Sequence, residues 1–499
     1  MKKETHPPPK PKTKDAAPRA AWFDPRAPYL VPLLLAVLVR AWQWALIPFA
    51  AEDAYITFRF AEHWAHGLGP VYNAGERVMG FSSPLWTAWL ALGTLVTGSA
   101  FPVARFSGVV LDLATLVLGA RLLEKEHGRM TAWVFAAMLA VHPIFSANSV
   151  LGMETSLFLF LLVASAWAIG AGHRSAGPLI GLLALVRPEG VVAAAIAAIA
   201  ARPKDRLVAL AIFAVGVLGL TLYFGNPIPQ SVIAKAATYG IAGPLSGIQW
   251  IEGFTPWLIQ GRWPVTPEGN SLLPIALVGT PAALVGAWLL WRKRGRPGAA
   301  WIVGAAGMVL LFGYFVAGAP YFYWYGVVPT AGWVWLAAIG MPEISRHRLL
   351  FASLAVFVIS DTWMLRNLYA GRVQEEVRNF RVIGLTLRDM AGGRGSVMLE
   401  PIGHVGDVAK SMRIIDEVGL VAPRVSQRRR QGAGWYADMV AQERPDWLIV
   451  RRGFFERNES FAGVSSPFRS DADRAAVLAA YDAVPLPDAA LMRIYRRKP

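Results

Sequence analysis

Eleven apolar segments follow one another along the first three quarters of the chain, and they constrain its fold more than any other feature. A helix needs about 20 predominantly apolar residues to cross the ~30 Å hydrocarbon core of a bilayer. Hydrophobic residues make up 55% of the 499 residues and charged residues only 16%, which excludes an ordinary soluble protein. We therefore predict a mainly α-helical, polytopic membrane protein. Its expected spans centre on 29–50, 103–123, 131–147, 154–171, 176–187, 189–201, 207–225, 272–292, 299–318, 322–340 and 349–366.

The basic residues of the connecting loops predict how these segments are oriented. The segment 85–98 is apolar but short for a span, so we place it as a surface or re-entrant helix on the outer side. With that placement the loops rich in Lys and Arg fall on one side, as cytoplasmic loops do. The net charge of +16 then needs no nucleic-acid partner. We predict a multi-pass membrane protein with its N-terminus cytoplasmic and its C-terminal part on the outer side, which for a bacterial inner membrane is the periplasm.

Composition divides the chain into three parts. Residues 1–28 are rich in Lys and Pro and are expected to form a disordered cytoplasmic tail rather than a cleaved signal peptide. Residues 29–366 would form a transmembrane domain that includes an outer loop at 51–102. Residues 367–499 have the composition of a small soluble α/β domain. Its expected helix and strands are 373–390, 396–399, 447–450 and 491–495.

The outer loop opens with two adjacent acids, Glu52 and Asp53, directly after the first apolar segment. Polar groups inside a bilayer must be satisfied internally, so this pair marks the point where water or a cavity begins. Residues 55–66 then alternate apolar and polar side chains at helical spacing and end at Gly67 and Gly69. This pattern is typical of an amphipathic helix on the membrane surface.

The same loop resembles a known family. The stretch EDAYITFRFAEHWAHGLGPVYNAGERVMGFSSPLW is similar to the first extracytoplasmic loop of the GT-C glycosyltransferases. The resemblance is strongest to the arabinofuranosyltransferase-like family, which includes the mycobacterial terminal arabinofuranosyltransferase. Glu52 stands where that family has Asp. Further blocks resemble the family in the same order: LGMETSLF, LVRPEG, GNPIPQSVIAK, FYWYGVVP and VGDVAKSMRIIDEVGL.

This resemblance implies an activity. It implies inverting transfer of a sugar, with arabinofuranose as one candidate, from a polyprenyl-phosphate donor to an extracytoplasmic glycan, glycolipid or protein. The transition state of such a transfer resembles an oxocarbenium ion, so one carboxylate on the acceptor face suffices as the base. We expect Asp53 to be that base, with Glu52 either positioning the acceptor or tuning Asp53 by like-charge repulsion. The alternative is that these acids only cap the surface helix.

The leaving phosphate of such a donor needs outward-facing cations near membrane depth. The candidates are Arg187 in LVRPEG, Lys235 in PQSVIAK, Arg59 and Arg77. Arg187 is favoured because RPEG splits the segment 176–201 into two halves that are each too short to cross, and broken helices of this kind line cavities. For each cation the alternative is a long side chain that reaches the membrane interface.

Other acids and aromatic residues stand at the same outer ends. Glu154 and Glu189, together with Asp53, could hold Mg²⁺ or Mn²⁺, although their spacing does not demand a metal. Cysteine is absent, which excludes thiolate ligands and disulfides. An aromatic cluster is expected either to wall the donor cavity or to form a membrane-interface belt. Its members include Tyr323, Trp324 and Tyr325.

The soluble tail shows no metal cluster, phosphate-binding loop or catalytic triad in its sequence. We expect it to hold the acceptor, and Asp407 and Asp416 are the candidate residues there. The alternative is that both are residues of exposed loops.

The competing function is a transporter or flippase of lipid-linked sugars, which also needs many spans and broken helices. Such a protein is expected to show internal symmetry between its halves, and the sequence shows none. A transporter would also have little use for paired acids in a loop and a large outer domain.

Two charges lie deep within apolar segments, Arg40 in LLLAVLVRAWQW and Asp112 in GVVLDLATLV. An unpaired charge at such a depth costs at least ~2.5 kcal/mol on insertion scales. At 1.5 Å per residue both lie about 14–15 Å below the outer boundary. We therefore predict a buried ion pair between Arg40 and Asp112. The alternative is that Arg40 faces the donor cavity and binds phosphate.

Overall fold

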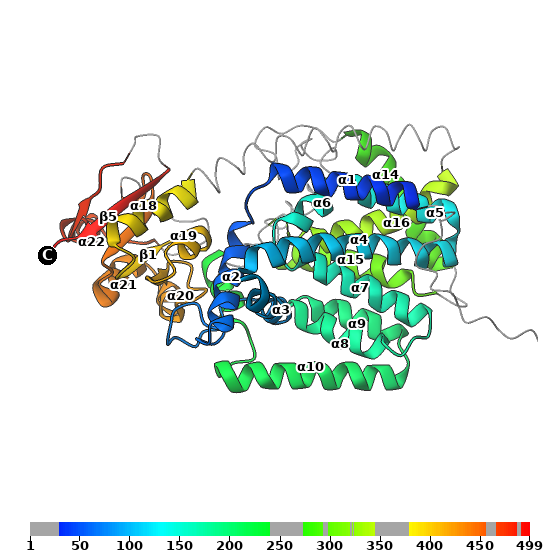
Figure 1. The fold of residues 1–499 in the computed structure, drawn as a ribbon, viewed down its shortest axis with the longest axis horizontal. Helices are drawn as coiled ribbons and strands as arrows, with labels where there is room; N and C mark the ends of the chain where they lie inside the picture. The colour runs from blue at the N-terminus through cyan, green and yellow to red at the C-terminus, as the bar shows by residue number, and fades with distance from the viewer. Residues whose placement is uncertain are drawn as a thin grey trace, which may run out of the picture.

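The computed structural model describes residues 29–239, 273–292, 298–319, 322, 324–344, 379–455, 466–486 and 491–499. They form a body of helices and a smaller α/β tail domain, which lie side by side along the long axis of the molecule (Figure 1). Helices α2 (Glu52–Ala65) and α3 (Pro84–Thr97) lie at the end of the body that faces the tail domain. The predicted boundary at residue 367 lies outside the described residues.

The body consists of helices that follow most of the predicted apolar segments. By length and apolar composition, three of the described helices are able to cross a membrane, namely α4, α10 and α16, and the bent pair α5 and α6 would make a fourth. The other apolar helices are shorter, and the segment 349–366 lies outside the described residues, so the number of spans stays a prediction. The bounds are α1 (Leu30–Leu46), α4 (Ala100–His127), α5 (Arg129–Val141), α6 (Pro143–Val150), α7 (Thr155–Gly170), α8 (Ala176–Val186), α9 (Gly190–Ala200), α10 (Pro203–Phe224), α14 (Leu273–Arg292), α15 (Trp301–Ala317) and α16 (Val327–Ile344).

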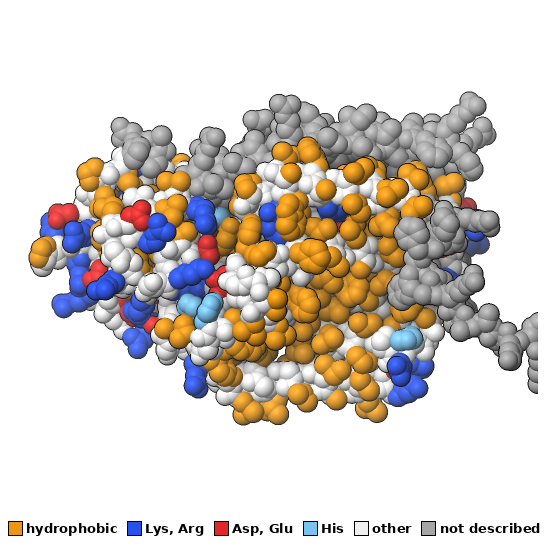
Figure 2. Space-filling view, viewed as in Figure 1, with side chains coloured by type: hydrophobic (Ala, Val, Ile, Leu, Met, Phe, Trp, Pro, Cys, Tyr) orange, Lys and Arg blue, Asp and Glu red, His pale blue; other side chains and the backbone are white. Residues whose placement is uncertain are grey.

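The surface of the body is that of a membrane protein. Figure 2 shows hydrophobic side chains spread over the body, whereas the charged side chains gather over the tail domain. On α10, Leu210, Val215, Leu218 and Leu222 are all exposed. Exposed apolar area of this extent is unfavourable in water, and it suits contact with lipid.

The interruption predicted within 176–201 is confirmed, since α8 ends at Val186 and α9 begins at Gly190. Arg187 is extended, with φ −156° and ψ 158°, because the proline that follows disfavours helical geometry at this position. Gly190 has no side chain to clash with α8: a Cβ atom there would lie 2.2 Å from the carbonyl oxygen of Leu183. The motif RPEG therefore breaks the helix and lets its two halves pack closely.

The predicted ion pair between Arg40 and Asp112 is confirmed. Arg40 Nη2 lies 2.8 Å from Asp112 Oδ2, and both side chains are almost fully buried between α1 and α4. The guanidinium also donates to the carbonyl oxygens of Leu139, at 2.9 Å, and Ala140 on α5. Arg40 is thus satisfied by the protein interior, which removes it from the candidate phosphate ligands.

The tail domain is built on a five-stranded sheet with the order β2-β1-β3-β5-β4. Strands β2, β1 and β3 are parallel, and β5 and β4 are antiparallel to their neighbours. The strands predicted at 396–399, 447–450 and 491–495 are confirmed as β1, β3 and β5, and the described part of the predicted helix forms α18. The bounds are α18 (Val382–Ala391), β1 (Ser396–Leu399), α19 (Gly403–Val408), β2 (Arg413–Asp416), α20 (Pro423–Arg430), α21 (Trp435–Glu443), β3 (Trp447–Arg451), α22 (Asp471–Ala479), β4 (Tyr481–Ala483) and β5 (Met492–Arg497).

One face of this sheet shares a hydrophobic core with the outer loop. Val397 and Leu399 of β1 pack in the same cluster as Ile56, Phe60 and Tyr72 of the loop. Met398 points to the other face, because successive side chains of a strand alternate, and packs under α21. The outer loop and the tail domain therefore form one packed unit rather than two separate ones.

Candidate active site

Helix α2 brings the two loop acids to the junction between the body and the tail domain. The residue before it, Ala51, has no side chain with which to cap the helix, and Glu52 and Asp53 occupy the first turn. Negative charge is favourable there because the free N–H groups make this end of a helix partly positive. The two carboxylates nevertheless contact different partners: Glu52 contacts the start of α19 and Asp53 contacts Lys235.

Asp53 faces Lys235. Asp53 Oδ2 lies 3.2 Å from Lys235 Nζ, which also donates to the phenol oxygen of Tyr325 at 3.3 Å. Lys235 belongs to α11 (Gln230–Tyr239), whose first residue donates a backbone N–H to the carbonyl oxygen of Met79 at 2.8 Å. The ammonium lies 5.2 Å from the centre of the Phe322 ring. The structure thus brings together a carboxylate, an ammonium and a phenol in one group.

A second ionic group lies deeper in the body, at the break between α8 and α9. Arg187 Nη1 lies 2.5 Å from Glu154 Oε1, and Arg187 Nη2 lies 2.6 Å from Glu189 Oε1. Tyr314 donates to the same Glu189 oxygen at 2.9 Å. The guanidinium of Arg187 also lies 4.9 Å from the centre of the Tyr325 ring. Tyr325 therefore links this second group to the first.

The predicted aromatic cluster forms part of the wall here. Trp324 is buried and stacks on Phe322 with ring centres 5.0 Å apart, and Tyr325 stacks on Tyr314 at 5.8 Å. Tyr323 lies outside the described residues.

Glu52, predicted either to position the acceptor or to tune Asp53, contacts the tail domain. Its carboxylate accepts the backbone N–H groups of Gly403 and His404, the latter at 2.8 Å. These residues begin α19 of the tail domain. In the structure Glu52 therefore joins α2 to the tail domain, although it lies next to Asp53 in sequence.

Arg59 and Arg77 also differ from the predicted phosphate ligands. Arg59 is almost fully buried and donates to carbonyl oxygens of both the loop and the tail domain, which are those of Tyr72, Gly406, Lys410 and Met412. Arg77 is exposed, and its guanidinium lies 5.1 Å from the centre of the Tyr223 ring at the end of α10. Neither contacts the group around Asp53.

A cavity of about 150 Å³ opens beside Asp53, between the body and the tail domain. The tail domain contributes charged side chains that sequence reasoning missed, above all Glu400 and Arg451. Each lies at the end of a strand, and the start of the loop after a predicted strand was the only available signal. The lining residues are Glu52, Asp53, Ile56, Lys235, Phe322, Trp324, Phe380, Glu400, Pro401, Ile402, Asp416, Val418, Leu420 and Arg451.

Asp416 lines this cavity, but its carboxylate is hydrogen-bonded to the backbone. Its carboxylate accepts N–H groups of Val418, at 2.9 Å, Leu420 and Val421. Burial raises the pKa of Asp416 to about 6, against the opposing effect of these N–H donors. Its geometry indicates that it holds the loop after β2. The other tail candidate, Asp407, pairs with Arg381 at 3.1 Å.

The fold is shared with solved structures of membrane transferases. ArnT from Cupriavidus metallidurans bound to undecaprenyl phosphate superposes with a TM-score of 0.60 at 8% identity, covering 93% of this chain and 97% of that one. The chain has the GT-C fold. The oligosaccharyltransferase of Archaeoglobus fulgidus in its apo form superposes with a TM-score of 0.53 at 14% identity, covering 87% of this chain and 71% of that one.

Sequence relatives of this GT-C chain match a smaller part of it than the solved structures do. A terminal beta-(1->2)-arabinofuranosyltransferase from Corynebacterium glutamicum is 26% identical over 296 residues, which is 49% of this chain and 42% of that protein. A protein of the same name from Mycobacterium tuberculosis is 30% identical over 235 residues, which is 41% of this chain and 36% of that protein. The chain thus spans less than half the length of the curated relatives it matches. Residues 366–492 match a family described as a domain of unknown function (DUF8728).

The acids of this candidate site form ion pairs with cations of the protein. Within the described ranges, no group of three or more His, Asp or Glu side chains is arranged to hold a metal ion. Asp53 contacts Lys235, and Glu154 and Glu189 contact Arg187. Hard oxygen ligands would suit Mg²⁺ or Mn²⁺, but in this arrangement a divalent ion would have to displace those side chains. As placed, these residues therefore do not fit the divalent ion that the sequence left open.

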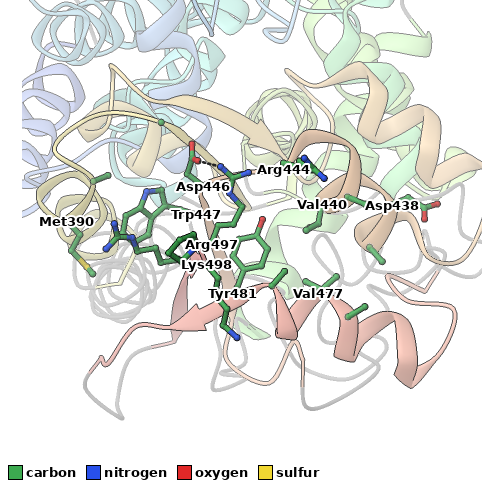
Figure 3. A pocket seen from close by; sticks show the side chains of 18 of the residues that line it. Met390, Asp438, Val440, Arg444, Asp446, Trp447, Val477, Tyr481, Arg497 and Lys498 are labelled. Carbon is green, nitrogen blue, oxygen red and sulfur yellow. Dashed lines mark hydrogen bonds and ion pairs between the residues drawn. The ribbon is translucent and has the colours of Figure 1, made fainter.

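A larger hollow of about 1130 Å³ lies at the opposite end of the tail sheet (Figure 3). Gly395, Asp446 and Trp447 line it at or beside the starts of β1 and β3. Asp446 pairs there with Arg497 at 2.8 Å. This hollow and the cavity beside Asp53 thus lie at opposite ends of the same strands, and Asp53 does not line the larger one.

Proposed function

We propose that the chain is an inverting glycosyltransferase that moves a sugar from a polyprenyl-phosphate donor to an extracytoplasmic glycan or glycolipid. The observation that carries this proposal is the position of Asp53, which faces Lys235 and lines a cavity at the end of the helical body. A single displacement at a sugar phosphate requires a carboxylate and a cation, and both side chains line this one small cavity.

In the proposed reaction, Asp53 is the general base. The acceptor hydroxyl oxygen attacks the anomeric carbon from the face opposite the phosphate, and Asp53 takes the hydroxyl proton as the new C–O bond forms. The bond between the anomeric carbon and the phosphate oxygen breaks, and the electron pair leaves with the polyprenyl phosphate. One displacement of this kind inverts the anomeric configuration.

Lys235 is the proposed partner of the leaving phosphate. Its ammonium is part exposed to the cavity and is shared between Asp53 and the Tyr325 phenol. An incoming phosphate would draw Lys235 toward itself and free the carboxylate of Asp53 to meet the acceptor. The same movement would therefore bind the donor and prepare the base.

Arg187 has a different proposed role. It lies between the carboxylates of Glu154 and Glu189, so its charge is already more than balanced. Its contact with the Tyr325 ring suits a residue that holds Tyr325 toward Lys235 and the donor. We propose that Glu154, Glu189 and Arg187 position Tyr325 rather than bind phosphate directly.

The relatives support the lipid-linked donor. The solved ArnT carries undecaprenyl phosphate, and the curated relatives are named as arabinofuranosyltransferases. On this basis we propose a polyprenyl-phosphate arabinofuranose as the donor and place the cavity on the periplasmic side of an inner membrane. The N-terminus would then be cytoplasmic.

The test supplies the purified protein in nanodiscs with polyprenyl-phosphate arabinofuranose and an arabino-oligosaccharide acceptor. We expect equal amounts of polyprenyl phosphate and extended oligosaccharide, with the anomeric configuration inverted relative to the donor. A lipid-linked sugar that crosses the bilayer of proteoliposomes without being consumed would instead establish the competing transporter.

A further inference from the structure

The parallel strands of the tail domain end at the candidate active site. Glu400 follows β1 directly, Asp416 is the last residue of β2, and Arg451 is the last residue of β3. All three line the cavity that contains Asp53. In open α/β sheets, ligands bind beyond the carboxyl ends of parallel strands, where the strand order reverses direction.

The order of the strands places such a reversal beside β1. The chain passes from β1 to β2 on one side and then crosses to β3 on the other side. Glu400 and Arg451 lie across this point, because β1 and β3 are neighbours. Arg451 Nη2 lies 3.1 Å from Glu400 Oε2, so the two side chains form one charged pair at the ends of these strands.

This pair is available to a ligand in a way that Asp416 is not. Asp416 is almost fully buried and accepts backbone N–H groups of its own loop. The side chains of Arg451 and Glu400 are 46% and 18% exposed, respectively. Together the two side chains carry N–H donors and a carboxylate acceptor, which is the combination that binds neighbouring hydroxyl groups of a sugar.

The docking of the tail domain holds this pair at a fixed place relative to Asp53. Glu52, directly before Asp53, accepts N–H groups at the start of α19, and Tyr72 donates to the carbonyl oxygen of Ile402 at 2.8 Å. Ile402 lies two residues after Glu400. A sugar held by Glu400 would therefore be held at a set distance from the proposed base.

We propose that Glu400 and Arg451 form an acceptor subsite, which binds hydroxyl groups of the terminal sugar of the acceptor glycan and orients one hydroxyl toward Asp53. This inference rests on the proposed function for the identity of the reaction. The chemistry of the pair defines the ligand class as a neutral polyhydroxylated sugar. Asp53 and Lys235 then act on the reacting bonds, while the tail domain selects and places the acceptor.

The test compares Glu400→Gln and Arg451→Gln with a matched control, Arg497→Gln. Arg497 is 40% exposed, close to the 46% of Arg451, and it forms an ion pair with Asp446 at the other end of the same sheet (Figure 3). We expect either variant of the subsite to raise the KM for an arabino-oligosaccharide acceptor at least tenfold. The KM for the polyprenyl-phosphate donor and its slow hydrolysis without acceptor are expected to change less than twofold. The control is expected to behave as the unmodified protein.

The inference is overturned if the acceptor KM is unchanged, if the control raises it equally, or if the donor KM rises by the same factor. Should Arg451→Gln fail to fold, Arg451→Lys keeps the charge but loses the paired N–H donors, and an intermediate rise in the acceptor KM is expected.

Direct binding of a fluorescent arabino-oligosaccharide separates this inference from the proposed function. If the protein binds the oligosaccharide through Glu400 but transfers no sugar, the proposed function is wrong and the subsite stands. If the protein binds no oligosaccharide, the subsite is wrong.

Discussion

Glu52 Oε2 accepts the backbone N–H of His404 at 2.8 Å, so the first residue of α2 is hydrogen-bonded to the tail domain more than 350 residues later. The next residue, Asp53, faces Lys235 of α11 instead. Two adjacent carboxylates thus have separate tasks. One holds the tail domain in place, and the other is the proposed base.

For Asp53, we expect Asp53→Asn to lower the rate of transfer at least ~10²-fold, because the amide cannot take the acceptor proton. The melting temperature and the donor KM are expected to change little. Asp407→Asn provides the control, since Asp407 pairs with Arg381 on the tail domain away from the cavity. Near-normal turnover by the Asp53→Asn variant would show that Asp53 is not the base.

For Glu52, we expect Glu52→Gln to weaken the docking of the tail domain on α2 by roughly 1.5–3 kcal/mol, because hydrogen bonds to a charged acceptor are lost. Faster hydrogen exchange of the amides at 403–408 would report it. Glu76→Gln is the control: Glu76 also joins the loop to the tail through Arg413, but both side chains are partly exposed to solvent, so the expected loss is below ~1 kcal/mol. Equal effects of the two changes would contradict this account.

For Lys235, we expect Lys235→Met to raise the donor KM at least tenfold, because the phosphate loses its nearest cation. Arg77→Gln, which removes an exposed cation stacked on Tyr223, is expected to change the donor KM less than twofold. Titration with polyprenyl phosphate as a competitive inhibitor measures both. A donor KM that depends on Arg77 but not on Lys235 would reverse the assignment.

For the pair of Arg40 and Asp112, we expect Arg40→Leu and Asp112→Leu each to destabilise the protein by about 3–5 kcal/mol, because each leaves a buried charge without its partner. The double variant is expected to recover much of that loss. A double-mutant cycle on the free energy of unfolding gives the coupling, and strictly additive losses would mean that the two charges do not interact.

For Asp416, the raised pKa predicts a pH dependence of stability. In the folded protein burial favours the neutral carboxyl, with a pKa of about 6 against an ordinary value of 3.8. The stability that Asp416 contributes through this raised pKa is therefore fully present below about pH 4. It is lost as the pH rises through about 6, which lowers the free energy of unfolding by up to roughly 3 kcal/mol. Melting of the unmodified protein and of Asp416→Asn across pH 4–8 measures it. As the pH rises, the melting temperature of the unmodified protein should fall relative to that of the Asn variant.

Some of this structure could be predicted because local rules determine it. Arg40 and Asp112 were paired from helical rise alone, since two antiparallel spans that share a loop place equal depths opposite each other. The break at RPEG was predictable because these residues interrupt the apolar run 176–201. Strands β1 and β3 were recognisable as buried apolar runs. The GT-C fold was recognised from ordered blocks of residues.

Other features depend on how distant parts dock, and no local pattern reveals them. Arg59 looked like an outer cation, but the tail domain brings three carbonyl oxygens to it. Glu400 and Arg451 belong to no motif in the sequence, and only the parallel pairing of β1 and β3 makes them neighbours. Strand β4 has only three residues and one buried side chain, so it carries no alternation that sequence reasoning could detect.

The core that the outer loop shares with the tail sheet also bears on how the protein is made. Ile56, Phe60 and Tyr72 leave the ribosome long before Val397 and Leu399, the residues that cover them. Contacts at such sequence separation form late, because a long loop must close first. During synthesis the loop that carries Asp53 would therefore stay incompletely packed until the last fifth of the chain has been made and folded. A chain truncated before β1 would lack the cavity beside Asp53, because Glu400, Asp416 and Arg451 form part of its lining.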